Sequence, residues 1–402
     1  KYNCTAMYAR VMHARIEENI KKIADYVETC GINRVEMRDT KMGIICTGVM
    51  YAYIKDVFPN ASVLKLGMSY PLPQNMIKDF ASKVDKVYVI EELDPVIEEQ
   101  VKSMGVDCVG KELFPACYEL LPDRLLDICL ENGILDKDPR THDVKEVENL
   151  PGRNPVLCAG CPHRSTYYVL KKHDIACAGD IGCYNLGAQP PFEAQHTMGC
   201  MGASIGQLHG MSLANLPENR VCTIGDGTFW HSGLPALANM VHNNGRGVVI
   251  LMDNDNTAMT GHQDNPATDY RVLRNVEATK IDIPAVCRAM GVELVKTVNA
   301  FDVNDVEAGL KECMAYDKVS VLITKGECVQ FNKFSSTPYT VEADKCIACQ
   351  TCFKCGCPAI MVSDEENPKT HKKKCRIDPT LCNGCGICSQ VCPVKAIAKK
   401  ED

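Results

Sequence analysis

The sequence has few aromatic residues, no long apolar run and no excess of positive charge. Aromatics make up 6% of its 402 residues, with a single tryptophan. No apolar stretch approaches the about 18 residues that mark a candidate membrane span, and neither a charged-then-apolar leader nor a lipidation signal is found. The net charge of -7 gives no electrostatic basis for binding nucleic acid. We therefore expect a cytoplasmic protein that binds neither membranes nor nucleic acid.

The start of the chain does not resemble the start of a domain. The first residue is Lys1 rather than Met, and apolar residues recur at helical spacing between Met7 and Val27. We predict one helix from Lys1 to Gly31 and interpret 1–38 as a helical remnant and linker. A further N-terminal domain is expected to precede it in the complete protein.

Two α/β patterns and a cysteine-rich tail follow. Short apolar runs at 43–49, 62–66 and 86–91 alternate with helix-like segments, which predicts a parallel-sheet domain over 39–135. Charged residues and prolines indicate a linker over 136–154. A second α/β domain over 155–335 is expected to have strands at 221–225, 248–253, 292–295 and 319–324, and helices such as 234–242. Residues 341–402 form a third domain, too small to depend on a hydrophobic core alone.

Cysteine is what the sequence has in excess, with 25 residues. In a long chain without a leader, cysteines at fixed spacings indicate metal thiolates rather than disulfides. The tail holds two Cys-x2-Cys-x2-Cys triplets, each followed by a Cys-Pro pair. Three thiolates at this spacing bind three irons of one cubane, while the cysteine before proline binds the other cluster. The predicted ligands are Cys346, Cys349, Cys352 and Cys392 for one [4Fe-4S] cluster, and Cys382, Cys385, Cys388 and Cys357 for the second.

Two further cysteines of the tail need an interpretation. The first motif has one more residue than the bacterial ferredoxin pattern, and Cys355 lies inside that gap. Cys355 could replace Cys357 as ligand, although Pro358 favours Cys357. Cys375 is interpreted as a bystander. Zinc is the main alternative metal, but zinc ribbons carry two pairs of cysteines rather than two triplets that each end in Cys-Pro.

A candidate magnesium site lies where two predicted strands end. Gly225-Asp226-Gly227 follows one strand, and the polar run 253–256 follows the next. Magnesium prefers octahedral oxygen ligands and leaves room for phosphate oxygens. The Asp226 carboxylate, the Asn254 side chain and the Asn256 backbone carbonyl would supply three ligands, and Asp253 could replace Asn254. This pattern resembles the diphosphate-binding motif of thiamine-diphosphate enzymes; the alternative is a Gly-Asp turn beside a polar loop.

Motifs along the whole chain resemble the large subunit of indolepyruvate ferredoxin oxidoreductases. They are CAGCPHR at 158–164, GDIGCYNL at 179–186, MGASIG at 201–206, GDGTFWHSG at 225–233 and TAMTGHQ at 257–263, followed by the two-cluster tail. KLGMSYPLP at 65–73 and VIEELDP at 89–95 resemble the family's middle domain. The resemblance implies an α/β fold with two parallel-sheet domains, one transketolase-C-like and one thiamine diphosphate-binding, and a small ferredoxin-like α+β domain. The family's pyrimidine-binding domain, which supplies a glutamate, has no counterpart here.

The resemblance also implies further site residues. Cys158, Cys161, Cys183 and Cys328 match the ligands of a third, proximal [4Fe-4S] cluster, and Gly182, Gly202, Gly225 and Gly227 would join the magnesium ligands in binding the cofactor. His231 and His262 flank the magnesium motifs and are candidate catalytic residues that would orient a carboxylate or an oxyanion; capping or core hydrogen bonding is the alternative. His163 and Arg164 would bind the diphosphate or pair with a carboxylate.

The activity implied is oxygen-sensitive oxidative decarboxylation of aryl pyruvates such as indolepyruvate. The products would be aryl-acetyl-coenzyme A and reduced ferredoxin, with thiamine diphosphate and Mg²⁺ as further cofactors. A smaller beta subunit, in a hetero-oligomer, would complete the enzyme. A non-oxidative thiamine-dependent lyase would have no use for the eight tail cysteines. Oxidation of pyruvate or another 2-oxoacid, and a non-catalytic electron-transfer scaffold that needs a separate pyrimidine domain, are the alternatives.

Overall fold

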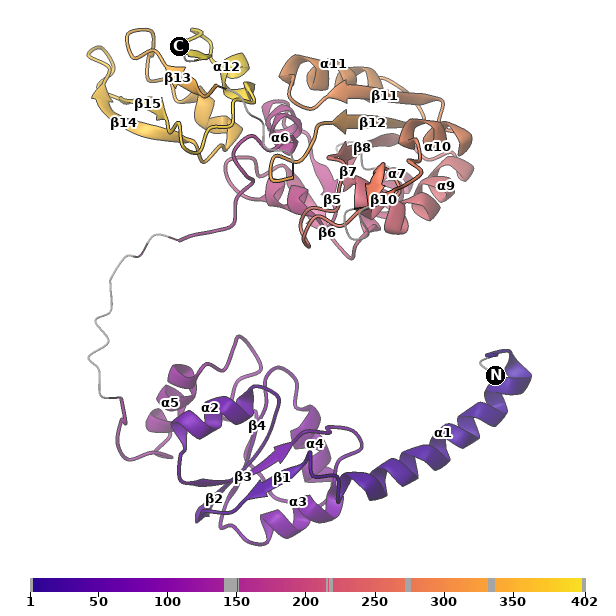
Figure 1. The fold of residues 1–402 in the computed structure, drawn as a ribbon, viewed down its shortest axis with the longest axis vertical. Helices are drawn as coiled ribbons and strands as arrows, with labels where there is room; N and C mark the ends of the chain where they lie inside the picture. Colours follow the sequence, from indigo (N-terminus) through magenta and orange to yellow (C-terminus); the bar gives the residue numbers. More distant parts are fainter. Residues whose placement is uncertain are drawn as a thin grey trace. The chain divides into compact units, whose positions relative to one another are not determined.

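The computed structural model describes residues 3–140, 150, 152–214, 216, 220–271, 276–331 and 337–399. The chain divides into two compact units, Lys1–Asn149 and Leu150–Asp402, and each is described by itself (Figure 1). Most of the linker expected over 136–154 lies outside the described residues. Among the helices that the structure does describe, none is long and apolar enough to span a membrane.

The first unit is built on a four-stranded sheet in the order β1-β3-β2-β4. Strands β2 (Asp39–Thr47), β3 (Ala61–Leu66) and β4 (Val87–Ile90) are parallel, as the apolar runs predict. Strand β1 (Arg34–Glu36) pairs antiparallel with β3. The sheet therefore begins before residue 39, the expected start of the domain. The polar three-residue strand β1 carries no apolar run that would have predicted it.

Helices cover both faces of this sheet. Neighbouring residues of β2 point to opposite faces, so that Ile44 packs with α2 (Met50–Val57) and α5 (Pro122–Glu131), while Ile45 packs with α3 (Gln74–Ala81) and α4 (Val96–Ser103). The N-terminal helix α1 spans Ala6–Val27, shorter at both ends than expected. Val27 is its one buried residue.

The second unit contains a six-stranded sheet in the order β11-β12-β8-β7-β5-β6, in which every pair is parallel. The strands are β5 (Cys177–Gly179), β6 (Gln195–Met198), β7 (Val221–Gly225), β8 (Gly247–Asp253), β11 (Leu294–Asn299) and β12 (Val319–Lys325). A two-stranded ribbon, β9 (Tyr270–Arg271) and β10 (Val276–Glu277), lies outside it. Strands β7 and β8 are the sheet's centre, and both are buried on the two faces.

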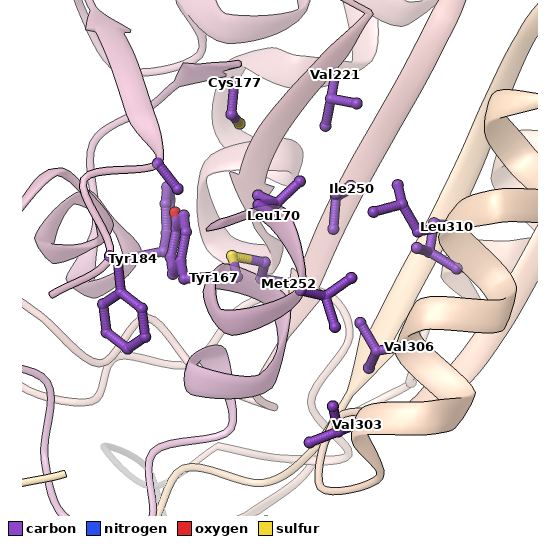
Figure 2. Packing of buried hydrophobic residues seen from close by; sticks show 14 of the residues in the cluster. Tyr167, Leu170, Cys177, Tyr184, Val221, Ile250, Met252, Val303, Val306 and Leu310 are labelled. Carbon is purple, nitrogen blue, oxygen red and sulfur yellow. The ribbon is translucent and has the colours of Figure 1, made fainter. Parts of the chain in front are cut away.

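Alternate residues of β8 and β12 enter two separate cores. Ile250, Met252 and Leu322 pack with α6 (His163–Lys172) and α11 (Val303–Met314), as Figure 2 shows for Leu170, Val306 and their neighbours. On the other face, residues such as Leu251 pack with α7 (Ala203–Leu213), α9 (Leu234–His242) and α10 (Ile283–Ala289). The chain reaches α9 through α8 (Asp226–Thr228) and the wide turn η2 (Phe229–Gly233).

The tail completes this unit with two small antiparallel pairs. Strand β13 (Tyr339–Val341) pairs with β16 (Ile397–Lys399), and β14 (Ile360–Glu366) pairs with β15 (Lys373–Ile377). Between them lie the short helices η4 (Thr351–Cys355) and α12 (Ile387–Val391). Turn η4 contacts α6, and α12 contacts α11, so the tail packs against the larger domain. The predicted fold class, two parallel-sheet domains with a small α+β tail, is confirmed.

Candidate functional site

Three oxygen atoms converge at the carboxyl ends of β7 and β8. The Asn254 side-chain oxygen lies 2.8 Å from the Asn256 backbone carbonyl and 3.2 Å from the Asp226 carboxylate. With the amide nitrogen on this side, it donates to both of these oxygens; with the amide oxygen on this side, three acceptors face one another, as they do around a bound cation. These are the three ligands that the sequence predicts, and the geometry fits Mg²⁺. The Asn256 side-chain nitrogen is buried without a partner among the described residues.

The electrostatics of Asp226 also favour a cation. Burial, and after it the neighbouring carboxylate of Asp253, raises the pKa of Asp226 to about 7. The Asn265 amide donates to its second carboxylate oxygen, over 3.1 Å. Asp253, the alternative ligand, is instead bound to Lys325, with 2.8 Å between Nζ and Oδ2. Lys325 also pairs with Asp255. Neither Asn265 nor Lys325 could be predicted as a partner from the sequence, because each lies far along the chain from the carboxylate that it contacts.

Glycines keep the loops around these oxygens close together. A Cβ at Gly225 or Gly182 would meet the ring of Tyr184 at 2.4 or 2.3 Å, and one at Gly227 would meet Thr257 at 2.2 Å. Gly202 has φ +88°, which favours glycine. The four predicted glycines therefore lie where the chain passes closely, although their contact with a cofactor stays a prediction.

Asp180, which sequence reasoning missed, ties two of these loops together. Its buried carboxylate accepts hydrogen bonds from the backbone amides of Gly202 and Ser204, over 2.7 and 3.0 Å, at the start of α7. Tyr184 makes a similar link, since its hydroxyl donates to Thr228 over 2.9 Å. Asp180 thus holds the 180–184 segment against the start of α7, and Tyr184 holds it against the 225–228 loop.

A cavity of about 210 Å³ opens beside the three oxygens. Three loops line it, at 181–184, 225–228 and 256–260, together with His163, Met201, Met252 and Asn254. Burial, and after it the charge of Arg164, lowers the pKa of His163 to about 4. At neutral pH this ring is therefore uncharged. It meets Tyr184 edge-on, with ring centroids 5.9 Å apart.

The two candidate catalytic histidines lie differently from His163. His231 is exposed and bonds to Ser232, 3.0 Å away, and it does not line this cavity. His262 is half-buried, with Nδ1 3.4 Å from the side-chain oxygen of Asn256. His262 thus contacts a predicted magnesium-ligand residue, whereas the hydrogen bond of His231 is to Ser232.

The four cysteines predicted for a proximal cluster come together beside the cavity. Burial, and then the thiols of Cys328 and Cys158, raises the pKa of Cys183, which also lines the cavity. Burial raises the pKa of Cys161 to about 12, with Cys158 and Cys183 among its neighbours. The Cys328 amide donates to the Asn254 carbonyl over 3.2 Å. The backbone hydrogen bond between Cys328 and Asn254 thus links the four cysteines to the three oxygens. Four thiols are the donors that an iron-sulfur cluster requires.

Arg164 takes neither of its expected roles. Its guanidinium is buried and donates to the backbone carbonyls of Leu157, Cys158 and Cys355. Those bonds engage all three nitrogens, so Arg164 holds backbone segments together. The guanidinium is therefore used for backbone carbonyls rather than for a diphosphate or a carboxylate.

The tail cysteines gather in two neighbourhoods. Cys388 has Cys385, Cys355, Cys357 and Cys382 around it, and burial with these thiols raises its pKa. Backbone amides donate to sulfur, as at cluster ligands: Tyr339 to Cys382 and Ala396 to Cys392, over 3.4 and 3.3 Å.

The second neighbourhood contains the cysteine expected to be a bystander. Cys375 lies 3.8 Å from Cys346 and 3.4 Å from Cys352, sulfur to sulfur. The hairpin of β14 and β15 brings Cys375 there, a contact that the spacing rule does not encode. Within the described residues, no three His, Cys, Asp or Glu side chains converge as closely as the ligands of a single metal ion.

Comparison with known proteins identifies the family. Residues 180–324 match the thiamine pyrophosphate enzyme C-terminal TPP binding domain, and 376–398 match a 4Fe-4S binding domain. Indolepyruvate oxidoreductase subunit IorA of Pyrococcus horikoshii is 36% identical over 443 residues, covering 100% of this chain and 67% of the relative. The chain belongs to the IorA family. The Archaeoglobus fulgidus IorA is 35% identical over 97% of this chain and 65% of its own length.

The chain thus spans about two thirds of the length of the IorA relatives it matches. It carries the family's thiamine pyrophosphate-binding and 4Fe-4S regions. Among solved structures, a 2-oxoglutarate:ferredoxin oxidoreductase from Magnetococcus marinus is similar, with 19% identity, a TM-score of 0.40, and coverage of 47% of this chain and 72% of that one.

Proposed function

We propose that the complete protein, with its partner subunit, catalyses oxidative decarboxylation of aryl pyruvates to aryl-acetyl-coenzyme A with ferredoxin as electron acceptor. The observation that carries the proposal is the joining of two donor sets in one site. The oxygens of Asp226, Asn254 and Asn256 fit a diphosphate-bound metal, and the Cys328 amide on the Asn254 carbonyl brings four thiols beside them. A decarboxylase that also passes on electrons needs both sets.

The proposed metal ligands act through their charge and geometry. Asp226, Asn254 and Asn256 would hold Mg²⁺. Gly182, Gly202, Gly225 and Gly227 let the loops around these ligands pack closely, and we propose that their backbone lies against the diphosphate. When bound, thiamine diphosphate supplies the carbon nucleophile and electron sink of 2-oxoacid decarboxylation, and iron-sulfur clusters accept electrons.

The cavity residues would shape the environment of the reacting group. Met201, Met252 and the ring of Tyr184 give the cavity an apolar wall, which would limit the access of water to the reacting group. His163 stays neutral at pH 7, so it adds no positive charge beside the Cys161 thiol, to which its own backbone amide donates. We propose that His262, rather than His231, faces the substrate, because His262 contacts the magnesium-ligand residue Asn256.

Three [4Fe-4S] clusters are proposed. Their ligands would be Cys158, Cys161, Cys183 and Cys328; Cys346, Cys349, Cys352 and Cys392; and Cys382, Cys385, Cys388 and Cys357. We keep Cys357 rather than Cys355 as the ligand, because Pro358 follows Cys357 and because Cys357 packs with Cys382 and Cys388.

Indolepyruvate is the proposed substrate because the relatives bear its name. A smaller subunit, coenzyme A and an external ferredoxin are the proposed partners. We place the protein in the cytoplasm, where all 25 cysteines, none of them in a disulfide, would stay reduced.

Product analysis tests the proposal. The full-length protein with its partner subunit, kept anaerobic, is incubated with indolepyruvate, coenzyme A and oxidised ferredoxin, and the products are identified by mass spectrometry. We expect the aryl-acetyl thioester, formed only when an acceptor is present. Release of the aryl-acetaldehyde without any acceptor would instead identify a non-oxidative lyase.

A further inference from the structure

Two cysteine-bearing loops of different domains are hydrogen-bonded to each other. The Asn383 side-chain amide donates to the Ala159 carbonyl over 2.7 Å. Ala159 lies between Cys158 and Cys161, and Asn383 directly follows Cys382. Gly160 makes this approach possible: its φ is +73°, and a Cβ there would meet the Asn383 side chain at 2.0 Å. The contact therefore depends on the backbone of one loop and the side chain of the other.

Arg164 adds a second link between the same domains. From Nε it donates to the Cys158 carbonyl, and from Nη1 to the Cys355 carbonyl, each over 2.9 Å. The thiols of Cys357 and Cys385 are electrostatic neighbours of Cys355. A planar guanidinium can reach separate carbonyls in fixed directions, whereas a lysine ammonium is a single point charge. Arg164 thus fixes the Cys158 loop relative to the cysteines around Cys385.

We propose that Asn383 and Arg164 are positioning residues that hold the Cys158–Cys161 loop against the Cys382–Cys385 loop, so that the two iron-sulfur sites form a magnetically coupled pair. This rests on the proposed function, because it takes both loops as cluster ligands. It goes further in stating which tail site lies next to the proximal one: the site of the second triplet, not the site of Cys346, Cys349 and Cys352.

Paramagnetic resonance of the reduced clusters tests the pairing without any substrate turnover. The full-length protein with its partner subunit is purified anaerobically, its iron is counted, and it is reduced until each cluster has taken up one electron, as checked by spin integration. We expect roughly twelve iron atoms per chain, four for each of three clusters, and spectra broadened by interaction between neighbours. Asn383→Leu and Arg164→Lys should retain the iron and lose the part of that broadening that comes from the proximal cluster, while the interaction between the two tail clusters remains.

The chain offers a matched control at the same interface. Gln390 donates to the Phe301 carbonyl over 2.7 Å and accepts from the Val303 amide over 2.8 Å, so it joins the same domains without touching the Cys158 loop. Gln390→Leu should keep the wild-type spectrum. If it lost the broadening as fully as Asn383→Leu, general loosening would explain the effect and the specific role would be wrong.

Two further outcomes would overturn the inference. A wild-type spectrum from iron-replete Asn383→Leu would show that the contact does not position the pair; if that variant failed to take up iron, Asn383→Asp would serve in its place. Wild-type protein with only about eight irons would remove the proximal cluster itself. That result would contradict the proposed ligands of the proximal cluster. The iron count therefore distinguishes a missing cluster from two clusters that are present but not paired.

Discussion

Asp226 is the residue on which the proposed metal site depends most, because it is the only anionic ligand of the three. We predict that Asp226→Asn weakens binding of thiamine diphosphate with Mg²⁺ by at least about tenfold, as measured by calorimetry. Asp253→Asn is the matched change, since Asp253 is bound to Lys325 instead. An equal loss in both variants would assign the metal to Asp253 as well.

The same carboxyl predicts a pH dependence. Burial and the neighbouring Asp253 raise the pKa of Asp226 to about 7 in the metal-free protein. A cation competes with the proton, so affinity should be full above pH 7 and fall by about tenfold per unit below it. Titration with Mn²⁺, followed by its resonance signal at pH 6, 7 and 8, avoids the ionisation of the cofactor's phosphates. A flat profile would contradict this account of Asp226.

Turn η4 separates Cys355 from Cys357, the two cysteines between which spacing alone could not decide the cluster ligand. It ends at Cys355, which faces the core beside α6, while Cys357 packs with the second triplet. We predict that Cys357→Ala loses roughly four irons per chain and that Cys355→Ala keeps them. Iron analysis of the two purified variants is the measurement, and the reverse pattern would make Cys355 the ligand.

The composition of a strand decides whether it could be predicted from the sequence. Strand β7 matches the expected 221–225 because an apolar run ends at Gly225-Asp226. Strands β5 and β6 were missed: they have three and four residues, and their residues include Gly179, Gln195 and His196. Their pairing comes from the sheet around them, which propensity does not encode.

In the site, too, some residues could be predicted from the sequence and others could not. Asp226, Asn254 and Asn256 were predictable because the ends of parallel strands meet at one edge of a sheet. The contacts of Asn265 and Arg164 were not, since Arg164 reaches Cys355, 191 residues away. Sequence spacing identifies ligands close along the chain, while the groups that hold them depend on tertiary packing.

For the whole molecule, the second unit contains both proposed donor sets and the tail, within one packed body. The chain covers about two thirds of its IorA relatives, so activity is expected of the complete protein with its partner rather than of this segment. Because both donor sets lie in one site, we predict that reduced acceptor and acyl-coenzyme A are formed together. Neither should form without coenzyme A.

The measurement that tests this most directly is an anaerobic assay of coenzyme A-dependent viologen reduction, by the full-length protein with its small subunit. Indolepyruvate, phenylpyruvate and pyruvate are compared side by side. We predict reduction with a higher kcat/KM for the aryl acids than for pyruvate. Absence of reduction with all three, in protein shown to hold thiamine diphosphate and iron, would contradict it.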